Sequence, residues 1–415
     1  MDESKSVYNV SPNVNTPDTI TLNDNKQPFI INDKPPEDFS NLCIFKNVLH
    51  NSRSAVKLGE NLWEEKWKVK VEKNLKPKSI LFCNNRIILY GDTEWLLFDV
   101  EGKLLNSGSL GYTEINISPD NNQFYYSDYN GLIQARDLIN GAYKFSLFAM
   151  FADNYRRSEI FTNNRLIYIL SKEEKEDPHG NHIRNSSVLE VQDIGEPRSI
   201  DDNDYLISAN RLNTIDLRSL DVYSVFTGEY LILAIPDEIL ITDSQLKIKK
   251  IIKSKFIPLS MSLDQSGRIY LIVRYTAADG NQKTGFWIIT QDGLRILNLD
   301  LPSDNDFNFP PVIGYNSKVF LIAGNKVFNI DTNIHFFSEK IFETPLGGFT
   351  ISKDNKLILS AGKLIYGLDD YGENIYITHL ENENWATGPV FINNDTFICA
   401  SSESLYCFTR GLQVR

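Results

Sequence analysis

The amino-acid sequence predicts an all-β protein, and within that class an eight-bladed β-propeller closed by an N-terminal strand. Three observations support this prediction. Apolar segments of strand length alternate with turn residues from about residue 60 onward. One unit of this pattern recurs at intervals close to the size of a propeller blade. Few windows show the period of an amphipathic helix.

The composition is that of a folded and acidic protein. The chain has 415 residues, of which 42% are hydrophobic and 12% aromatic, so it can bury a sizeable core. These values exclude a wholly disordered chain, a coiled coil and a collagen-like fibre. The net charge of −12 argues against a nucleic acid partner, because phosphate binding needs clustered Lys and Arg. Four cysteines are too few for a disulfide-stapled scaffold.

The N-terminal part of the chain differs from the rest. Its first 40 residues are rich in Asn, Asp, Ser and Pro, and their apolar residues come in short groups such as Phe29-Ile30-Ile31. Such a segment buries little, so we expect residues 1–58 to be a polar, flexible extension and residues 59–415 to form the propeller. No basic and apolar leader follows Met1, and no apolar run approaches the length of a membrane helix. We therefore expect a cytoplasmic location without membrane insertion.

The recurring unit is an apolar strand, a short polar turn and a second apolar strand. Its eight copies place the start of the second strand at Arg86, Gln123, Arg165, Glu229, Arg268, Lys318, Lys356 and Asp395. The residue before that start is Asn or Gly in seven copies, and these types enter the left-handed region at low cost. The eight residues are Asn85, Asn122, Asn164, Gly228, Gly267, Ser317, Asn355 and Asn394.

The spacings between copies indicate one blade each. They are 37, 42, 64, 39, 50, 38 and 39 residues, and a blade takes about 40–50. The two long spacings predict insertions, around 172–186 or 196–215 and around 275–283. The last copy lacks a fourth strand, which we expect residues 62–71 to supply, closing the ring and covering a sheet edge. Seven blades is the alternative, because the region 181–225 is poorly patterned.

One segment points to a propeller family. Gly131, Ala135, Asp137 and Gly141 have the spacing of the repeat in the PQQ-like, or quinoprotein-alcohol-dehydrogenase-like, propellers, and Phe145 stands where that family has a docking Trp. The chain resembles this family in architecture from about 60 to 410, but in detail over this one blade. Weaker echoes occur at 97–103 and 366–372.

The departures from that family bear on function. Its dehydrogenases use a vicinal Cys pair and a calcium site over the cofactor, whereas no two cysteines are adjacent here. The resemblance therefore implies a cofactor-less member, and such members serve as assembly scaffolds. WD40 signatures are absent, since there is neither a Gly-His nor a Trp-Asp dipeptide. Kelch repeats are also disfavoured, because Gly347-Gly348 is the single Gly-Gly pair.

Few residues suggest catalytic or metal chemistry. His179 and His182 have a metal-compatible spacing, but we favour a solvated, charged insertion. Cys399 and Cys407 lie symmetrically about Glu403, which allows a cross-strand disulfide, although two buried thiols is the interpretation we favour. The acidic clusters at 201–204 and 304–306 lack the spacing of a calcium loop. No nucleophile elbow, phosphate loop or dinucleotide fingerprint occurs, so we expect no cofactor and no metal.

A binding face is the better candidate. In a propeller, the turns between second and third strands and the connections between blades lie on one face. Exposed Trp, Tyr and Arg are enriched in binding hot spots. The predicted binding residues on this face are Trp95, Tyr129, Tyr155, Arg156, Arg157 and Trp385. For Trp95 and Trp385, ordinary packing between blades is an equally open alternative.

These observations favour a non-catalytic scaffold that presents a propeller loop face to other proteins. The alternative is an enzyme, or a carbohydrate- or small-ligand-binding propeller, with a site at the mouth of the central channel. Carboxylates or histidines converging at that mouth would favour the alternative, and a broad aromatic loop patch would favour the scaffold. A redox quinoprotein ranks third, because its Cys pair is missing.

Overall fold

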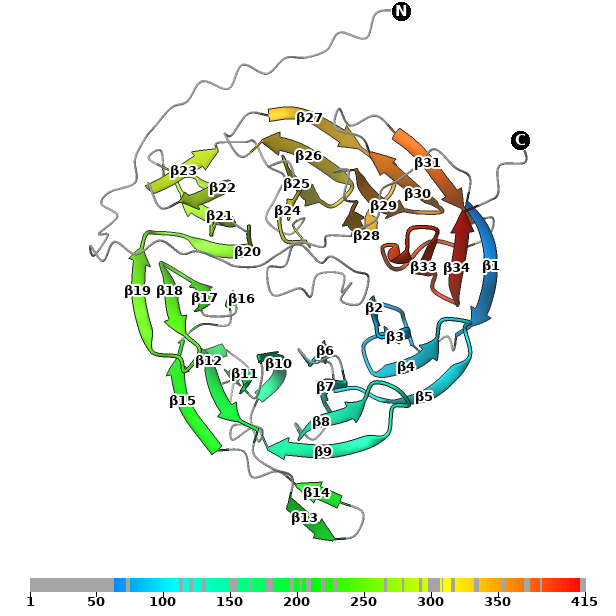
Figure 1. The fold of residues 1–415 in the computed structure, drawn as a ribbon. Coiled ribbons are helices and arrows are strands. Elements are labelled where there is room, and N and C mark those ends of the chain that lie inside the picture. Colours follow the sequence, from blue (N-terminus) through cyan, green and yellow to red (C-terminus); the bar gives the residue numbers. More distant parts are fainter. Residues whose placement is uncertain are drawn as a thin grey trace, which may run out of the picture.

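The computed structural model is a ring of eight four-stranded antiparallel sheets, with a small hairpin added to one of them (Figure 1). The prediction of an all-β, eight-bladed propeller is confirmed, and the seven-bladed alternative is wrong. The structure describes residues 63–410 except 72–74, 112–114, 119–121, 129–131, 149–154, 164–165, 177–181, 195–197, 202–203, 207–209, 218, 220, 227–229, 265–266, 278–279, 291–292, 298–306, 308, 315–317, 332–335, 353–355, 369–373 and 381–382. The predicted extension 1–58 lies outside the described residues.

The first four blades run from the innermost strand to the outermost in chain order. Blade 1 contains β2 (Ser79–Cys83), β3 (Arg86–Tyr90), β4 (Glu94–Asp99) and β5 (Leu104–Ser109). Blade 2 contains β6 (Asn116–Ile117), β7 (Gln123–Ser127), β8 (Leu132–Asp137) and β9 (Tyr143–Phe148). Blade 3 contains β10 (Tyr155–Asn163), β11 (Leu166–Glu176), β12 (His182–Asp193) and β15 (Asn210–Asp216). Blade 4 contains β16 (Tyr223–Phe226), β17 (Tyr230–Ile235), β18 (Glu238–Asp243) and β19 (Ile248–Lys253).

The other four blades complete the ring. Blade 5 contains β20 (Ile257–Leu263), β21 (Ile269–Thr276), β22 (Gln282–Thr290) and β23 (Gly293–Leu297). Blade 6 contains β24 (Val312–Ile313), β25 (Lys318–Ala323), β26 (Lys326–Asp331) and β27 (Phe336–Ile341). Blade 7 contains β28 (Leu346–Ile351), β29 (Leu357–Ala361), β30 (Leu364–Leu368) and β31 (Asn374–His379). Blade 8 contains β32 (Val390–Asn393), β33 (Thr396–Ala400), β34 (Ser404–Arg410) and β1 (Trp63–Lys70).

Blade 8 joins the two ends of the described chain. β1 pairs antiparallel with β34, so the predicted closure by an N-terminal strand is confirmed (Figure 1). The pairing shifts register between Glu65 and Trp67, which leaves Lys66 as a bulge. Without the bulge, Trp63 and Trp67 would lie on the same face of the strand, because side chains alternate with period two. The bulge places the two indoles on opposite faces.

The two tryptophans anchor β1 to its neighbours on either side. Trp63 is 6% exposed and contacts the rings of Phe391 and Phe397 edge-on, with centroids 5.8 and 5.0 Å away. The Trp67 indole Nε1 donates a hydrogen bond of 3.1 Å to the Val100 carbonyl of blade 1. A single strand therefore ties blades 8 and 1 together.

The repeat register read from the sequence matches the strands. The second strand of each blade begins at the predicted residue or one residue later. Asn85 and Gly267 have left-handed φ values of 57° and 79°, as expected. At Asn394 the expectation of a left-handed residue is wrong. There the Asn393 side chain accepts a 2.8 Å hydrogen bond from the Asp395 N–H, which closes the turn without a positive φ.

An aspartate organises the turn between third and fourth strands in three blades. The Asp99 carboxylate accepts hydrogen bonds from the N–H groups of Glu101 and Lys103, at 3.0 and 2.9 Å. The equivalent carboxylates of blades 2 and 4 also bind backbone N–H groups of their own turns. The three aspartates and the left-handed residues that follow them are Asp99 with Gly102, Asp137 with Gly141, and Asp243 with Leu246.

Both predicted insertions are longer hairpins. In blade 3, β11 and β12 extend well beyond the usual strand length. An extra hairpin, β13 (Arg198–Asp201) with β14 (Asp204–Leu206), follows β12 and adds to the outer edge of blade 2, where Leu206 pairs in parallel with Ser146. In blade 5, β21 and β22 form the long hairpin across 275–283.

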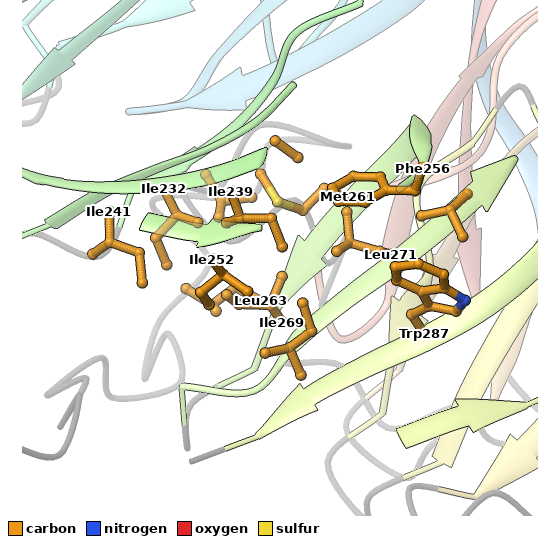
Figure 2. Packing of buried hydrophobic residues seen from close by; sticks show 14 residues of the cluster. Ile232, Ile239, Ile241, Ile252, Phe256, Met261, Leu263, Ile269, Leu271 and Trp287 are labelled. Atoms are coloured by element: carbon orange, nitrogen blue, oxygen red, sulfur yellow. The ribbon is translucent and has the colours of Figure 1, made fainter. Parts of the chain in front are cut away.

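The hydrophobic core lies between adjacent blades. Figure 2 shows the cluster between blades 4 and 5, which includes Ile239 and Ile241 of β18, Leu263 of β20 and Trp287 of β22. All four are less than a tenth exposed. Such clusters recur around the ring, and at about 25 cal/mol per Å² their burial is the main stabilising contribution. The described residues include no helix that is long and apolar enough to cross a membrane.

Candidate functional site

The candidate site is the loop face, which we define as the face that carries the turns between second and third strands and the connections between blades. Strand direction alternates within each blade, so these segments gather at the same end of every sheet. The first-to-second and third-to-fourth turns, including the aspartate turns, lie on the opposite face.

Backbone hydrogen bonds join neighbouring segments of the loop face to each other. In several blades, the turn between second and third strands bonds to the chain segment that leaves the fourth strand of the same blade. In blade 4, for example, Asp237 N–H donates to the Phe256 carbonyl at 2.9 Å, and Phe256 N–H donates to the Asp237 carboxylate at 3.1 Å. The corresponding backbone bonds in four further blades are Leu110 to Thr93, Phe342 to Asn325, Leu380 to Lys363 and Val71 to Glu403. The loop backbones are thus paired with each other, which favours a preformed surface.

The connection between blades 7 and 8 packs closely against the turn of blade 7 and against β28. The Trp385 backbone N–H donates to the Gly362 carbonyl at 2.8 Å, and its indole Nε1 donates to the Lys363 carbonyl at 3.1 Å. Gly388 lies so close to Gly348 that a Cβ on Gly348 would come within 2.3 Å of the Gly388 nitrogen. This close approach explains the glycine at 348. Gly347 is confined separately, since a Cβ there would lie 3.0 Å from the Trp385 carbonyl oxygen.

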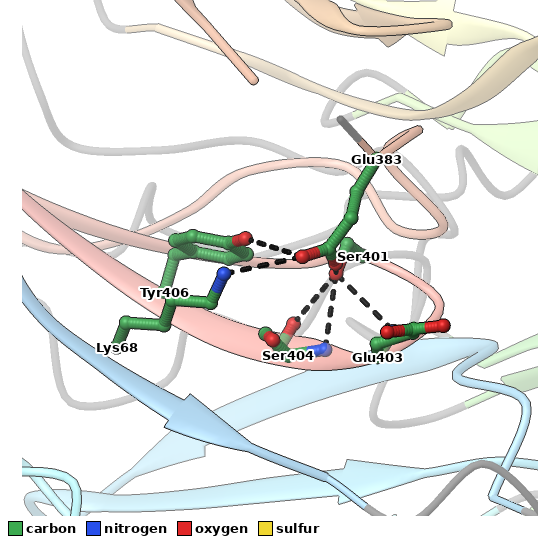
Figure 3. Close-up of polar contacts among 6 residues, drawn as sticks. All are labelled: Lys68, Glu383, Ser401, Glu403, Ser404 and Tyr406. Atoms are coloured by element: carbon green, nitrogen blue, oxygen red, sulfur yellow. Dashed lines mark hydrogen bonds and ion pairs between the residues drawn. The ribbon is translucent and has the colours of Figure 1, made fainter. Parts of the chain in front are cut away.

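A cluster of charged and hydroxyl side chains lies beside this connection (Figure 3). We call Lys68, Glu383, Ser401 and Tyr406 the Glu383 clasp. Lys68 Nζ and Tyr406 Oη each donate to Glu383 Oε1 at 3.1 Å, and Ser401 Oγ donates to Oε2. The ammonium of Lys68 also stands 4.7 Å from the centre of the Tyr406 ring. The clasp therefore links β1, β34 and the connection from blade 7.

The protonation states of the clasp are those of a structural network. Burial raises the pKa of Glu383, but the hydrogen bonds from Ser401, Lys68 and Tyr406 outweigh it and hold this pKa below the usual 4.5. The hydrogen bond with Tyr406 raises the pKa of Lys68 above its usual 10.5. Burial raises the pKa of Tyr406 as well. None of these shifts moves a group toward neutral pH, where a general acid or base works best.

The predicted binding residues occupy different environments. Trp95 has no exposed surface, and its ring packs edge-on against Phe124 of blade 2 at 5.0 Å. Trp385 is 5% exposed and packs edge-on against Tyr406 at 5.3 Å. Of the two interpretations of these tryptophans, their burial supports packing between blades. An indole of this kind fixes the loop face without contributing surface to it.

The other predicted binding residues are placed only in part. The backbone of Tyr155, Arg156 and Arg157 begins β10, with Arg157 opposite Lys172. The side chains of these residues, and all of Tyr129, lie outside the described part of the chain. Their role in binding stays a prediction.

The chemical candidates can be placed more fully. His182 begins β12 opposite Glu176, whereas His179 lies outside the described residues, as does the cluster 304–306. Within the part of the chain that the structure describes, no group of three or more His, Cys, Asp or Glu side chains is arranged to hold a metal.

The two cysteines of blade 8 point to opposite faces of the sheet. Cys399 pairs with Tyr406, and Cys407 pairs with Ile398, so the two thiols enter different hydrophobic clusters. The cross-strand disulfide considered from the sequence is therefore excluded, and both thiols are free and buried. Burial raises the pKa of the Cys407 thiol to about 12, which makes it a poor nucleophile.

The Glu383 clasp was missed by sequence reasoning. Lys68 and Tyr406 lie on paired strands, which the predicted closure could have brought together. Glu383 comes from a connection whose path the sequence does not define. No local motif marks it.

Comparison with known proteins supports the fold. No protein-family model matches this chain, and no curated protein matches it in sequence. The structure is similar to that of BamB from Moraxella catarrhalis, a PQQ-like propeller, with a TM-score of 0.57 and 8% identity over 84% of this chain and 100% of that chain. It is also similar to Sqt1 from Saccharomyces cerevisiae, a WD40 propeller, with a TM-score of 0.52 and 13% identity over 86% of this chain and 100% of that chain. At these identities the likeness establishes a β-propeller and no finer family.

Proposed function

We propose that this protein is a non-catalytic interaction scaffold that presents the loop face of its propeller to partner proteins. The observation that carries the proposal is the repeated hydrogen bonding between turns and blade connections on that face. Because the loops are already paired, little conformational entropy is lost when a partner binds them. A wide, preformed face suits recognition of folded proteins.

The electrostatics of the clasp support a scaffold over an enzyme with a site there. Its carboxylate, ammonium and phenol bond to one another, and their pKa values move away from neutrality. Catalytic groups more often have pKa values shifted toward the working pH. We infer that the Glu383 clasp has a structural role and stabilises the conformation of the loop face.

Within the propellers, we propose that the chain is a PQQ-like member. The aspartate turns support this assignment, since Asp137 and Gly141 form the turn that the sequence pattern anticipates. Phe145, in the position of the family's docking Trp, is buried and faces the Tyr125 ring at 6.3 Å. We keep the expectation of a cytoplasmic location, which imaging of the tagged full chain would check.

Affinity purification of the full chain from its native host, followed by mass spectrometry, tests the scaffold. We expect at least one stoichiometric protein partner. Arg156→Glu/Arg157→Glu should weaken its capture, because these residues are predicted to lie at the loop face. The matched control, Lys103→Glu/Lys356→Glu, makes the same charge change on the opposite face and should leave capture unchanged. Absence of any stoichiometric partner would refute the proposal and direct a small-molecule stability screen at the channel mouth.

A further inference from the structure

The outer edge of blade 4 is unusually basic for this protein. β19 is the outermost strand of its sheet and lies on the rim of the ring (Figure 1). The chain as a whole carries a net charge of −12. Yet five lysines and no acidic residue fall within 247–255, and they are Lys247, Lys249, Lys250, Lys253 and Lys255. We call this strand and its flanking lysines the β19 edge.

Only part of this positive charge is neutralised within the molecule. Lys249 forms an ion pair of 2.9 Å with Asp243, and Lys253 forms one of 3.1 Å with Glu238. The side chains of Lys247, Lys250 and Lys255 form no ion pair with the described residues. Three lysines of this edge thus have no ionic partner among the described residues.

The outer backbone of β19 is not paired with any strand that the structure describes. On one side β19 pairs with β18, and on its other side no described strand follows. An outermost strand directs about half of its N–H and C=O groups away from the sheet. Alternation places Lys250 on the face of Ile252, and Lys253, which is paired with Glu238, on the face of Ile251. Ile248, with 44% of its surface exposed, adds an apolar contact.

This molecule already adds a strand to the outer edge of another blade. The hairpin of β13 and β14 extends the sheet of blade 2, with Leu206 parallel to Ser146 of β9. The added hairpin spans a segment with aspartates at 201, 202 and 204. An outer edge of this propeller thus accepts a further strand from an acidic segment.

Protection of an exposed edge is the alternative explanation, because lysines on an edge strand also prevent unwanted pairing with other chains. If it explained the β19 edge, other outer strands would share the pattern. β19 itself contains three lysines and no acidic residue. β5 and β31 contain no lysine, β9 and β27 contain one each, and the three lysines of β1 are accompanied by Glu64 and Glu65. A general need for edge protection therefore does not account for three unbalanced lysines in one outer strand.

We propose that the β19 edge is a docking site for an extended acidic segment of a partner protein, which adds to blade 4 as a fifth strand. This inference rests on the proposed scaffold function and specifies one class of partner for it. Main-chain hydrogen bonds would supply affinity, and the lysines would select acidic side chains.

A synthetic peptide tests the proposal on the full-length chain. The probe is a labelled peptide of about ten residues, the length of a long strand, in which Glu and Val alternate. We expect binding by fluorescence anisotropy at low salt, and new protection of the amides of 248–253 by hydrogen exchange. Lys247→Glu/Lys250→Glu/Lys255→Glu should weaken binding about tenfold or more, because three attractive contacts become repulsive. A peptide with proline in place of valine should bind less well, since it lacks donors for strand pairing.

The control separates local from overall charge. Lys70→Glu/Lys103→Glu/Lys340→Glu changes the net charge equally at lysines that form no ion pair with described residues, and it should retain parental affinity. Equal weakening by both triple variants, or no binding of the parent, would overturn the proposal. Self-association that only the β19 variant abolishes would instead make a second copy the occupant. If that variant still captures the native partners of the parent, the docking site fails while the scaffold function stands.

Discussion

Asp237 illustrates how a single residue holds the loop face. It ends the two-residue turn between β17 and β18 with φ of 65°, in the left-handed region that most residues avoid. Its carboxylate offsets this strain by accepting a hydrogen bond from the Phe256 N–H. Asn can adopt the same φ and accept the same bond, so the turn requires either of these residue types.

Replacement of Asp237 by Ala should therefore be costly. Asp237→Ala loses the hydrogen bond and keeps the strained φ, and we expect the free energy of unfolding to fall by about 1–2 kcal/mol. Asp237→Asn should remain within about 0.5 kcal/mol of the parent. Urea denaturation of both variants measures the difference. Equal stability of the Ala variant would show that the hydrogen bond between the Asp237 carboxylate and the Phe256 N–H contributes nothing to stability.

The Glu383 clasp predicts a pH dependence. The pKa of Glu383 is lowered in the folded state, so its contribution is present above its usual pKa of 4.5 and is lost as pH falls through the lower folded value. The pKa of Lys68 is raised, so its contribution is present below its usual 10.5 and is lost as pH rises through the higher folded value. The clasp is thus intact between about pH 5 and pH 10.

Glu383→Gln tests this directly. Gln keeps the shape of the side chain but removes its charge, and we expect a loss of about 1–2 kcal/mol at neutral pH. The difference from the parent should shrink in acid, where the parent carboxylate is itself protonated. Thermal denaturation at several pH values would measure both effects. A difference independent of pH would mean that packing, and not charge, gives Glu383 its role.

At the scale of an element, the bulge in β1 is the informative feature. Lys66 is the extra residue, and it lets Trp63 and Trp67 enter clusters on opposite faces of the strand. Deleting Lys66 leaves Glu65 opposite Phe408 and Trp67 opposite Cys407, so both indoles keep their faces. Deleting Lys68 instead shifts one part of the strand by a residue and turns its side chains to the wrong face.

We therefore expect deletion of Lys66 to lower the stability much less than deletion of Lys68. Loss of Lys66 should cost about 1 kcal/mol or less, since only local twist and an exposed ion pair with Glu101 change. Loss of Lys68 should cost more, about 2 kcal/mol or above, because either the half-buried Trp67 indole or the half-buried Val69 side chain leaves its cluster. Denaturant titrations of the two deletion variants give the comparison. Similar losses would mean that the bulge itself is required.

At the scale of the whole molecule, periodicity predicted far more than individual side chains did. The recurring turn residues gave the number of blades and the closing strand, because each blade must repeat the same hairpin in order to close a ring. The face of the sheet on which a side chain lies could not be predicted where it depended on the length of one turn. Cys399 and Cys407 are symmetric about Glu403, but the turn is closed between Ser401 and Ser404 and contains two residues, which shifts the pairing by one.

Site residues were harder to predict for a related reason. A tryptophan near a loop can lie on the surface or between blades, and only the neighbouring blade decides. At Trp95 the absence of a side chain on Gly108 opens space for the indole, since a Cβ there would lie 2.7 Å from the ring. That relation spans two strands and appears in no local pattern. Glu383 likewise acquires its role from β1, whose position depends on ring closure.

The stability of the whole fold should depend on closure of the ring. Blade 8 depends on a strand from the other end of the chain, and this strand carries two indole anchors and the Lys68 arm of the clasp. Deleting residues 60–74 should expose the edge of β34 and lower the thermal midpoint by many degrees, as expected for a loss of several kcal/mol. The matched control removes a segment of the same length, 20–34, from the predicted extension and should leave the midpoint unchanged. A synthetic peptide spanning 60–74 should restore part of the stability when added in excess, by mass action. An unchanged midpoint after the first deletion would show that the ring holds without its closing strand.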